Sequence, residues 1–249
     1  MKALMMTKYG DALSSLEVQE VSTPKVGDNQ ILIKVHSASF NPFDYKLLRG
    51  DFKAMGKIQF PEGIGKDVSG VVEKVGKKVK TFKAGDKVYS RIDESFAGTM
   101  AEYVISNASD SANIPSNLSH EEAAGVPLAG LTAYQALNDV VKLSKGERIL
   151  IHAGSGGVGT FAIQFAKHLG AKVTTTTSTK NIELVKKLGA DKVIDYTKEN
   201  YLDEENKFDV VFDTLGGNHT LDSFKVLKDG GRLVSITGVI DSITAKQFG

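Results

Sequence analysis

Residues 148–159, with the sequence RILIHAGSGGVG, decide the fold of this chain of 249 residues. The apolar run that opens the stretch predicts a buried strand, and the glycines after it match the pattern G-x-G-x-x-G before a helix at 160–169. Gly154 permits a tight turn, Gly156 lets the backbone approach a pyrophosphate, and Gly159 allows close packing of helix on strand. The free N–H groups at the helix start attract an anion. A tight surface turn would carry similar glycines, but the flanking strand and helix favour dinucleotide binding.

The same alternation of strand and helix continues through 123–249. Glycines close three of the predicted helices, as C-terminal caps often do. We expect strands at 148–153, 171–177, 192–196, 208–215 and 232–238, and helices at 124–137, 160–170, 181–190 and 221–230, three of them ending at Gly170, Gly189 and Gly230. Strands joined by helices imply right-handed βαβ units, hence a doubly wound parallel sheet.

The first half, 1–122, follows a different pattern. Short strands are expected there, broken by Gly, Pro and Asp, at 30–35, 68–75, 87–89 and 99–105. The first of these alternates as a half-buried strand does. Regularly spaced short strands predict a barrel or sandwich. The expected organisation is therefore two domains, 1–122 and 123–249.

Composition excludes several classes of function. Lys plus Arg number 31 and Asp plus Glu 30, a net charge of +1, so no strong field draws the chain to nucleic acid or an anionic membrane. There is no cysteine, which removes disulfides, thiolate catalysis and Cys-containing zinc sites. The N-terminus reaches Lys8 and Asp11 too early for a signal peptide, and no apolar run approaches the ~20 residues of a membrane helix. We expect a soluble, cytoplasmic protein.

The tip of the second predicted strand of this domain indicates which dinucleotide binds. An acidic residue at such a tip would hold the ribose 2′-hydroxyl of NAD. Here the tip reads Thr-Thr-Ser-Thr-Lys at 176–180, without an acid. Lys180 supplies charge and Ser178 a short donor for a 2′-phosphate. NADP is favoured over NAD, although a solvated turn would look similar.

Six groups of residues together resemble the zinc-independent quinone oxidoreductases of the medium-chain dehydrogenase/reductase superfamily. Around the glycine pattern stand Gly146-Glu147, Leu150, Gln164 and Lys167; the others are Asn41-Pro42-x-Asp44, Gly65–Val72, Pro127–Tyr134, Ser178–Asn181 and Ile194–Asn200. The last two resemble the plant-type 2-alkenal and enone reductases in particular. The resemblance runs from Met1 to about Gly238.

The resemblance implies a GroES-like β-barrel domain followed by a Rossmann domain, with the active site between them. It places Asn41 and Tyr45 near the reacting groups and Thr132 at the nicotinamide carboxamide. It assigns the pyrophosphate to Gly156, Gly157 and Val158, within the pattern Gly154–Gly159. It assigns the 2′-phosphate end of NADPH to Ser178, Lys180 and Tyr196. Gly216 and Gly238 would end two strands at the carboxyl edge of the sheet, where they would contact the cofactor. For Gly216, a role as an ordinary turn glycine is as well supported as a role in cofactor binding.

The implied function is hydride transfer from NADPH to a quinone or an α,β-unsaturated carbonyl, a small-molecule substrate. Asn41 and Tyr45 would donate hydrogen bonds to the developing oxyanion. No metal is expected, because Asn41 and Lys66 stand where zinc-dependent members have Cys and His, and the five histidines read as structural or surface residues, His152 as packed. The alternative is a non-catalytic NADPH-binding protein on the same fold. Family members continue beyond the strand that precedes Gly238, so we expect a Rossmann domain truncated at its C-terminus, and a possible homodimer.

Overall fold

The computed structural model describes residues 1–249 apart from 57, 93–97, 205–206, 241–244 and 247–249. The chain divides into two compact units, Met1–Leu128 and Ala129–Gly249. The predicted domain boundary after residue 122 lies shortly before this division and stays a prediction.

The first unit is built on a five-stranded antiparallel sheet in the order β7-β3-β5-β6-β8. Its strands are β3 (Gln30–Ser39), β5 (Asp67–Val75), β6 (Lys87–Arg91), β7 (Tyr103–Asn107) and β8 (Ser111–Asn113). Branched aliphatic side chains such as Ile31, Ile33 and Val68 form the core of one face. From Ile33 to Ser39 the side chains of β3 alternate between buried or half-buried and exposed, as its sequence predicted, while Leu32 on the opposite face is also buried.

A second, three-stranded sheet and three helices complete this unit. The sheet has the order β2-β1-β4, from β1 (Lys2–Met6), β2 (Leu16–Glu20) and β4 (Glu62–Gly63). The helices are α1 (Ala12–Ser15), α2 (Pro42–Arg49) and α3 (His120–Ala124), with 3₁₀ turns at Lys53–Met55 and Ala108–Asp110. Pro42 opens α2, where a missing N–H costs nothing, and Gly50 closes it with φ +85°. Asn41 is thereby placed at the N-cap of α2.

The second unit is a parallel five-stranded sheet in the order β11-β10-β9-β12-β13. Its strands are β9 (Arg148–Ile151), β10 (Lys172–Thr177), β11 (Lys192–Asp195), β12 (Phe208–Asp213) and β13 (Leu227–Ser235). Between β9 and β12 the strand order reverses, and ligands of doubly wound sheets bind at such a switch point. The glycine pattern directly follows β9.

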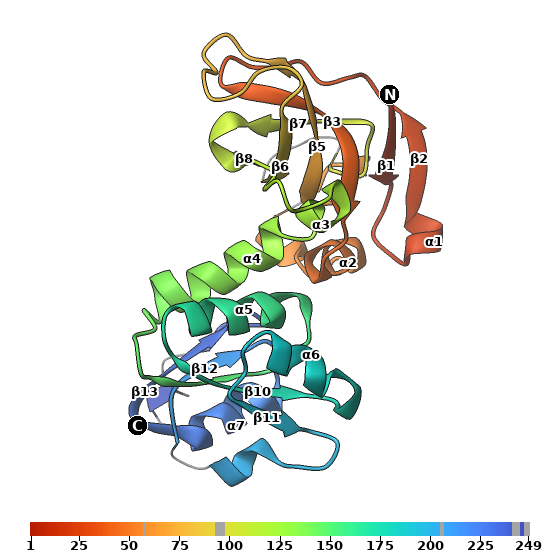
Figure 1. The fold of residues 1–249 in the computed structure, drawn as a ribbon. Coiled ribbons are helices and arrows are strands. Elements are labelled where there is room, and N and C mark those ends of the chain that lie inside the picture. The colour runs from red at the N-terminus through yellow and green to blue at the C-terminus, as the bar shows by residue number, and fades with distance from the viewer. Residues whose placement is uncertain (57, 93–97, 205–206, 241–244, 247–249) are drawn as a thin grey trace. The chain divides into compact units, whose positions relative to one another are not determined.

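Helices cover both faces of this parallel sheet (Figure 1). The covering helices are α5 (Gly157–His168), α6 (Ile182–Lys187) and α7 (Asn218–Val226), with 3₁₀ turns at Thr179–Asn181 and Tyr201–Glu204. Before them in the chain come α4 (Pro127–Tyr134), whose first two residues belong to the first unit, and a π-helical turn at Gln135–Val140. One core packs side chains of α5 and α6, such as Ile163 and Val185, against Ile149 and Ile151. The other packs Val226 and further apolar residues against the opposite face. The Rossmann arrangement predicted from the alternating pattern is confirmed.

Three local predictions are corrected. The single helix expected at 124–137 is α3, then α4 from Pro127, then the π-helical turn. The helix expected to end at Gly230 ends at Val226, and Gly230 lies inside β13 with φ +72°. The strand expected at 99–105 begins at Tyr103. Among the described residues, no helix has the length and apolar character needed to cross a membrane.

Candidate functional site

The turn after β9 is held by one residue of the neighbouring strand. The N–H of Ala153 donates to Thr176 Oγ1 (3.0 Å) and that of Gly154 to the Thr176 carbonyl oxygen (2.9 Å). Ala153, the residue before Gly154, adopts a left-handed conformation with φ +49°. An L-residue with a Cβ pays a steric cost there, which neighbouring bonds must offset.

Two of the four glycines in this turn are required by close contacts. A Cβ at Gly154 would lie 2.0 Å from Thr175 Oγ1, and one at Gly159 would lie 2.3 Å from the Ala153 carbonyl oxygen. At Gly156, the N-cap of α5, the nearest atom would be 3.2 Å away, and at Gly157 it would be 4.0 Å away. Two glycines therefore serve packing, and the two exposed ones leave the backbone accessible to a ligand.

A cavity of about 770 Å³ opens at the carboxyl edge of the parallel sheet. Of the predicted site residues it brings together Gly156, Ser178, Lys180 and Tyr196. The sequence assigned no individual binding role to the other residues of its walls, which are His152, Ala153, Ser155, Thr176, Thr177, Asn181, Glu199, Asn200, Tyr201, Leu215 and His219. Most of these follow strand ends, a position that strand prediction alone could have flagged. Its volume lies within the range of small-molecule and cofactor sites.

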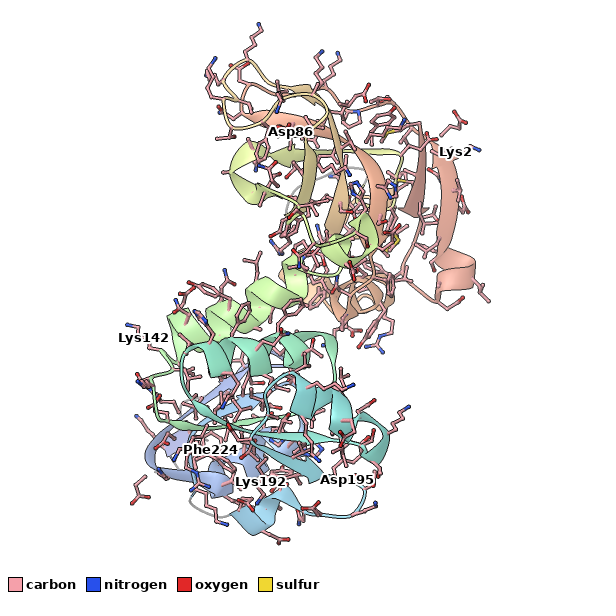
Figure 2. All side chains as sticks on the ribbon, viewed as in Figure 1. Lys2, Asp86, Lys142, Lys192, Asp195 and Phe224 are labelled. Atoms are coloured by element: carbon pink, nitrogen blue, oxygen red, sulfur yellow. The ribbon has the colours of Figure 1, made fainter. Side chains whose placement is uncertain are left out.

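The carboxylate at the end of β11, Asp195, is already hydrogen-bonded to threonine side chains. Asp195 ends β11 (Figure 2) and is buried, with Thr179 Oγ1 at 2.5 Å and Thr197 Oγ1 at 2.7 Å. The hydrogen bond from Thr179 is the main reason why the pKa of Asp195 lies below its usual range. Asp195 does not line the cavity, whereas Glu199 does. Near Ser178 the cavity therefore offers hydroxyls and the Lys180 cation, with Glu199 as the acid in its wall.

Other predicted residues of this unit lie outside that cavity. Val158 packs its side chain on the sheet core, and Thr132 is half-buried on α4. Gly216 has φ +79° and donates its N–H to Asp213 Oδ1 (3.0 Å). Gly238 is exposed and lines a smaller hollow of about 210 Å³ with Thr237. The structure accounts for Gly216 as a turn residue held by a buried carboxylate.

In the first unit Asn41 is 9% exposed and its amide is already bonded. Nδ2 donates to Asp67 Oδ2 (2.9 Å) and to Ser39 Oγ (3.1 Å), which uses both of its hydrogens. Ser39 Oγ itself donates to Asp67 Oδ2 (2.8 Å). Asn41 therefore presents Oδ1, an acceptor, where an oxyanion would need a donor.

Two buried carboxyls surround this amide. Burial raises the pKa of Asp67, against hydrogen bonds from Asn41, Ser39 and the Leu128 N–H, and the nearby Asp44 raises it further. Burial also raises the pKa of Asp44, whose Oδ2 accepts from the Asn41 N–H (2.7 Å). Acidic groups held this way are typical of functional sites.

Tyr45 lies on α2, one residue beyond Asp44, and is 40% exposed. The Arg49 guanidinium lies 5.2 Å from the centre of its ring. No hydrogen bond to the Tyr45 hydroxyl occurs within the described part of the chain. The phenol is therefore a donor that a small molecule can reach.

Comparisons with known proteins agree with this architecture. Residues 27–116 match the family described as alcohol dehydrogenase GroES-like domain, and residues 157–247 match the family described as zinc-binding dehydrogenase. The chain is 44% identical over 248 residues to a 2-methylene-furan-3-one reductase of Solanum lycopersicum, covering 96% of this chain and 63% of that one. It is 42% identical, with the same coverage, to a chloroplastic NADPH-dependent alkenal/one oxidoreductase of Arabidopsis thaliana.

A solved structure extends the likeness to three dimensions. Escherichia coli quinone oxidoreductase complexed with NADPH superimposes with a TM-score of 0.87 at 30% identity, covering 100% of this chain and 78% of that one. The chain belongs to the medium-chain dehydrogenase/reductase superfamily, and its homologues include quinone oxidoreductases and alkenal reductases. It spans 63% of the length of the two plant relatives.

The family description implies zinc, but the residues at Asn41 do not fit it. Zinc prefers thiolate, imidazole and carboxylate ligands, whereas the chain has no cysteine and places an amide at 41 and an ammonium at Lys66. The described residues hold no group of three His, Asp or Glu side chains arranged around a metal position. Asp67, a carboxylate bonded to the Asn41 amide, already accepts from Asn41, Ser39 and Leu128.

Proposed function

We propose that this chain forms part of an NADPH-dependent oxidoreductase that reduces a quinone or an α,β-unsaturated carbonyl without a metal. The observation that carries the proposal is the cavity beside the glycine turn, which combines accessible backbone at Gly156 with Ser178 and Lys180. The alkenal reductase and the NADPH-complexed quinone oxidoreductase to which it is similar support the same cofactor and substrate class.

The cofactor's pyrophosphate would lie against Gly156, Gly157 and Val158 at the start of α5. The N-terminus of this helix of 12 residues provides unpaired N–H groups and a partial positive charge. The steric freedom at Gly156 and Gly157 is what an approaching phosphate requires.

The 2′-phosphate would lie against Ser178, Lys180 and Tyr196. Lys180 is exposed at the cavity wall and Tyr196 is 62% exposed, so both can move toward a ligand. The Glu199 carboxylate in the same wall repels a phosphate, and the Lys180 charge offsets that repulsion. The Thr132 contact with nicotinamide, and those of Gly216 and Gly238, belong to the same proposal.

When bound, NADPH supplies the hydride. The protein's task is then to stabilise the negative charge that develops on the substrate oxygen, and Tyr45 is the donor we assign to it. Asn41, whose Nδ2 hydrogens are engaged, would accept through Oδ1 a hydrogen bond from cofactor or substrate. Asp67 and Ser39 keep the amide in that orientation.

A direct assay tests the proposal. The chain is mixed with NADPH and an enone, or with a naphthoquinone, and loss of the reduced nicotinamide is followed by absorbance. Turnover that survives exhaustive treatment with a metal chelator supports it. Tight NADPH binding without turnover of any enone or quinone would refute the catalytic assignment. A cytoplasmic location and a homodimer stay predictions; of the two plant relatives, one is chloroplastic.

A further inference from the structure

His152 connects the end of β9 to three other elements of the second unit. Its side chain has no exposed surface. Its backbone N–H donates to the Phe212 carbonyl (3.1 Å), and its carbonyl accepts from Thr214 Oγ1 (2.8 Å). The residue that follows it is the left-handed Ala153, so its position is coupled to that of the phosphate turn.

The hydrogen bonds of Ser223 determine the tautomer of this imidazole. Ser223 Oγ donates to the His219 carbonyl oxygen at 2.6 Å, which uses its one hydrogen. His152 Nε2, 3.2 Å from the same Oγ, must therefore be the donor in that pair. Burial, with a smaller effect from His219 and against Asp213, lowers the pKa of His152 to about 4. The ring is thus neutral near pH 7, and its Nδ1 has no proton.

The bare Nδ1 in turn directs the hydroxyl of Thr176. Thr176 Oγ1 lies 3.5 Å from Nδ1, a long bond in which only the hydroxyl can donate. Thr176 Oγ1 can then accept a hydrogen bond from the N–H of Ala153, whose nitrogen lies 3.0 Å away. The bonds run in one direction, from Ala153 to Thr176, His152 and Ser223, and end on the His219 carbonyl.

We propose that His152 is a positioning residue, whose tautomer sets the direction of this hydrogen-bond chain and so holds Ala153 in its left-handed conformation. Ala153 in that conformation keeps the turn and the Gly156 N-cap where a phosphate can reach them. The inference rests on the proposed cofactor, since it assigns a role in binding NADPH.

The first test removes one link without changing its shape. Thr176→Val in the full chain deletes the hydroxyl, and we expect the Kd for NADPH, measured by fluorescence titration, to rise about fivefold, as for one lost neutral hydrogen bond. Thr176→Ser restores the hydroxyl and should stay within about twofold of the unaltered chain. Val185→Ala, a core change on α6, is the control: it lowers the melting temperature but leaves the Kd unchanged.

The second test asks whether the chain acts through Ala153. Glycine adopts the left-handed conformation without a Cβ penalty, so Ala153→Gly should restore tight NADPH binding to the Thr176→Val variant. A double variant that binds as weakly as Thr176→Val would overturn the proposal.

Two further measurements distinguish a failure of the proposed function from a failure of the inference about His152. If the unaltered chain binds no NADPH, the proposed function fails; if it binds and Thr176→Val binds equally well, this inference fails instead. Nitrogen-15 NMR of the full chain at pH 7 reads the His152 tautomer directly and needs no variant. A protonated Nε2 with a bare Nδ1 supports the chain, and the opposite tautomer would refute it.

Discussion

Substitutions at two glycines of the phosphate turn, Gly159 and Gly157, should separate folding from cofactor binding. In Gly159→Ala the new Cβ would lie 2.3 Å from the Ala153 carbonyl oxygen and 2.7 Å from the Gly154 Cα, where real Cβ contacts stay beyond 3.0 Å. Both clashing atoms are backbone, so α5 must shift away from the turn. In Gly157→Ala the nearest atom is the Ala129 Cβ at 4.0 Å, an ordinary contact.

These distances set the expected magnitudes. Overpacking against backbone costs about 3 kcal/mol, which for a chain of this size lowers the melting temperature by about 6–12 °C. Gly157→Ala, at the first position of α5, should keep or raise the melting temperature, because glycine is a poor helix residue. If the pyrophosphate lies on Gly157, a larger side chain such as valine there should abolish NADPH binding in a folded protein.

Differential scanning fluorimetry of the apo chain and titration with NADPH measure the two effects independently. A Gly159→Ala variant as stable as the unaltered chain would refute the packing described for this turn. Equal NADPH affinity of the unaltered chain and Gly157→Val would refute the placement of the pyrophosphate.

Three further outcomes are expected. Lys180→Ala should weaken NADPH but not NADH binding in a titration, whereas the control Glu199→Gln should tighten NADPH; equal losses for both cofactors in Lys180→Ala would contradict a 2′-phosphate contact. Tyr45→Phe should lower kcat by about 100-fold with little change in KM, the value of one donor to an oxyanion, and unchanged kcat would remove Tyr45 from the mechanism. Because burial lowers the pKa of His152 to about 4, the unfolded chain takes up its proton first as pH falls from about 6.5, so the free energy of unfolding should drop by up to about 3 kcal/mol by pH 4. His152→Gln should lose this part of the pH dependence in urea titrations, and an identical pH profile would contradict a buried neutral imidazole.

Much of the fold was predictable because its signals are local. The apolar run before Gly154 and the glycines after it specify a strand, a turn and a helix within 20 residues. The misplaced end at Gly230 shows the limit of that information. A glycine after a helical pattern usually marks a C-terminal cap, but β13 pairs with β12 from Leu227 onward, and that pairing lies outside the local sequence.

The glycine pattern also shows how a correct motif can conceal its physical cause. The pattern predicts a tight turn at Gly154, and the residue with the unusual backbone angle in that turn is its neighbour Ala153. Gly154 is needed because Thr175, on the next strand, leaves no room for a Cβ. The two contacts that hold Ala153 and crowd Gly154 both come from β10, some 20 residues away, and appear only once the strands are paired in register.

The orientation of the Asn41 side-chain amide could not be predicted from the sequence either. An asparagine offers both a donor and an acceptor, so its residue type alone cannot say which end faces a ligand. Asp67 settles the choice, since a carboxylate oxygen 2.9 Å from the amide accepts and does not donate while it is ionised. Burial and the nearby Asp44 raise the pKa of Asp67, so protonation would give that carboxyl a hydrogen and let the amide turn round. Which end of the Asn41 amide faces a ligand therefore depends on Asp67 as well as on Asn41. In Asp67→Asn the new amide can itself donate, so we expect substrate turnover to change even though Asp67 is fully buried.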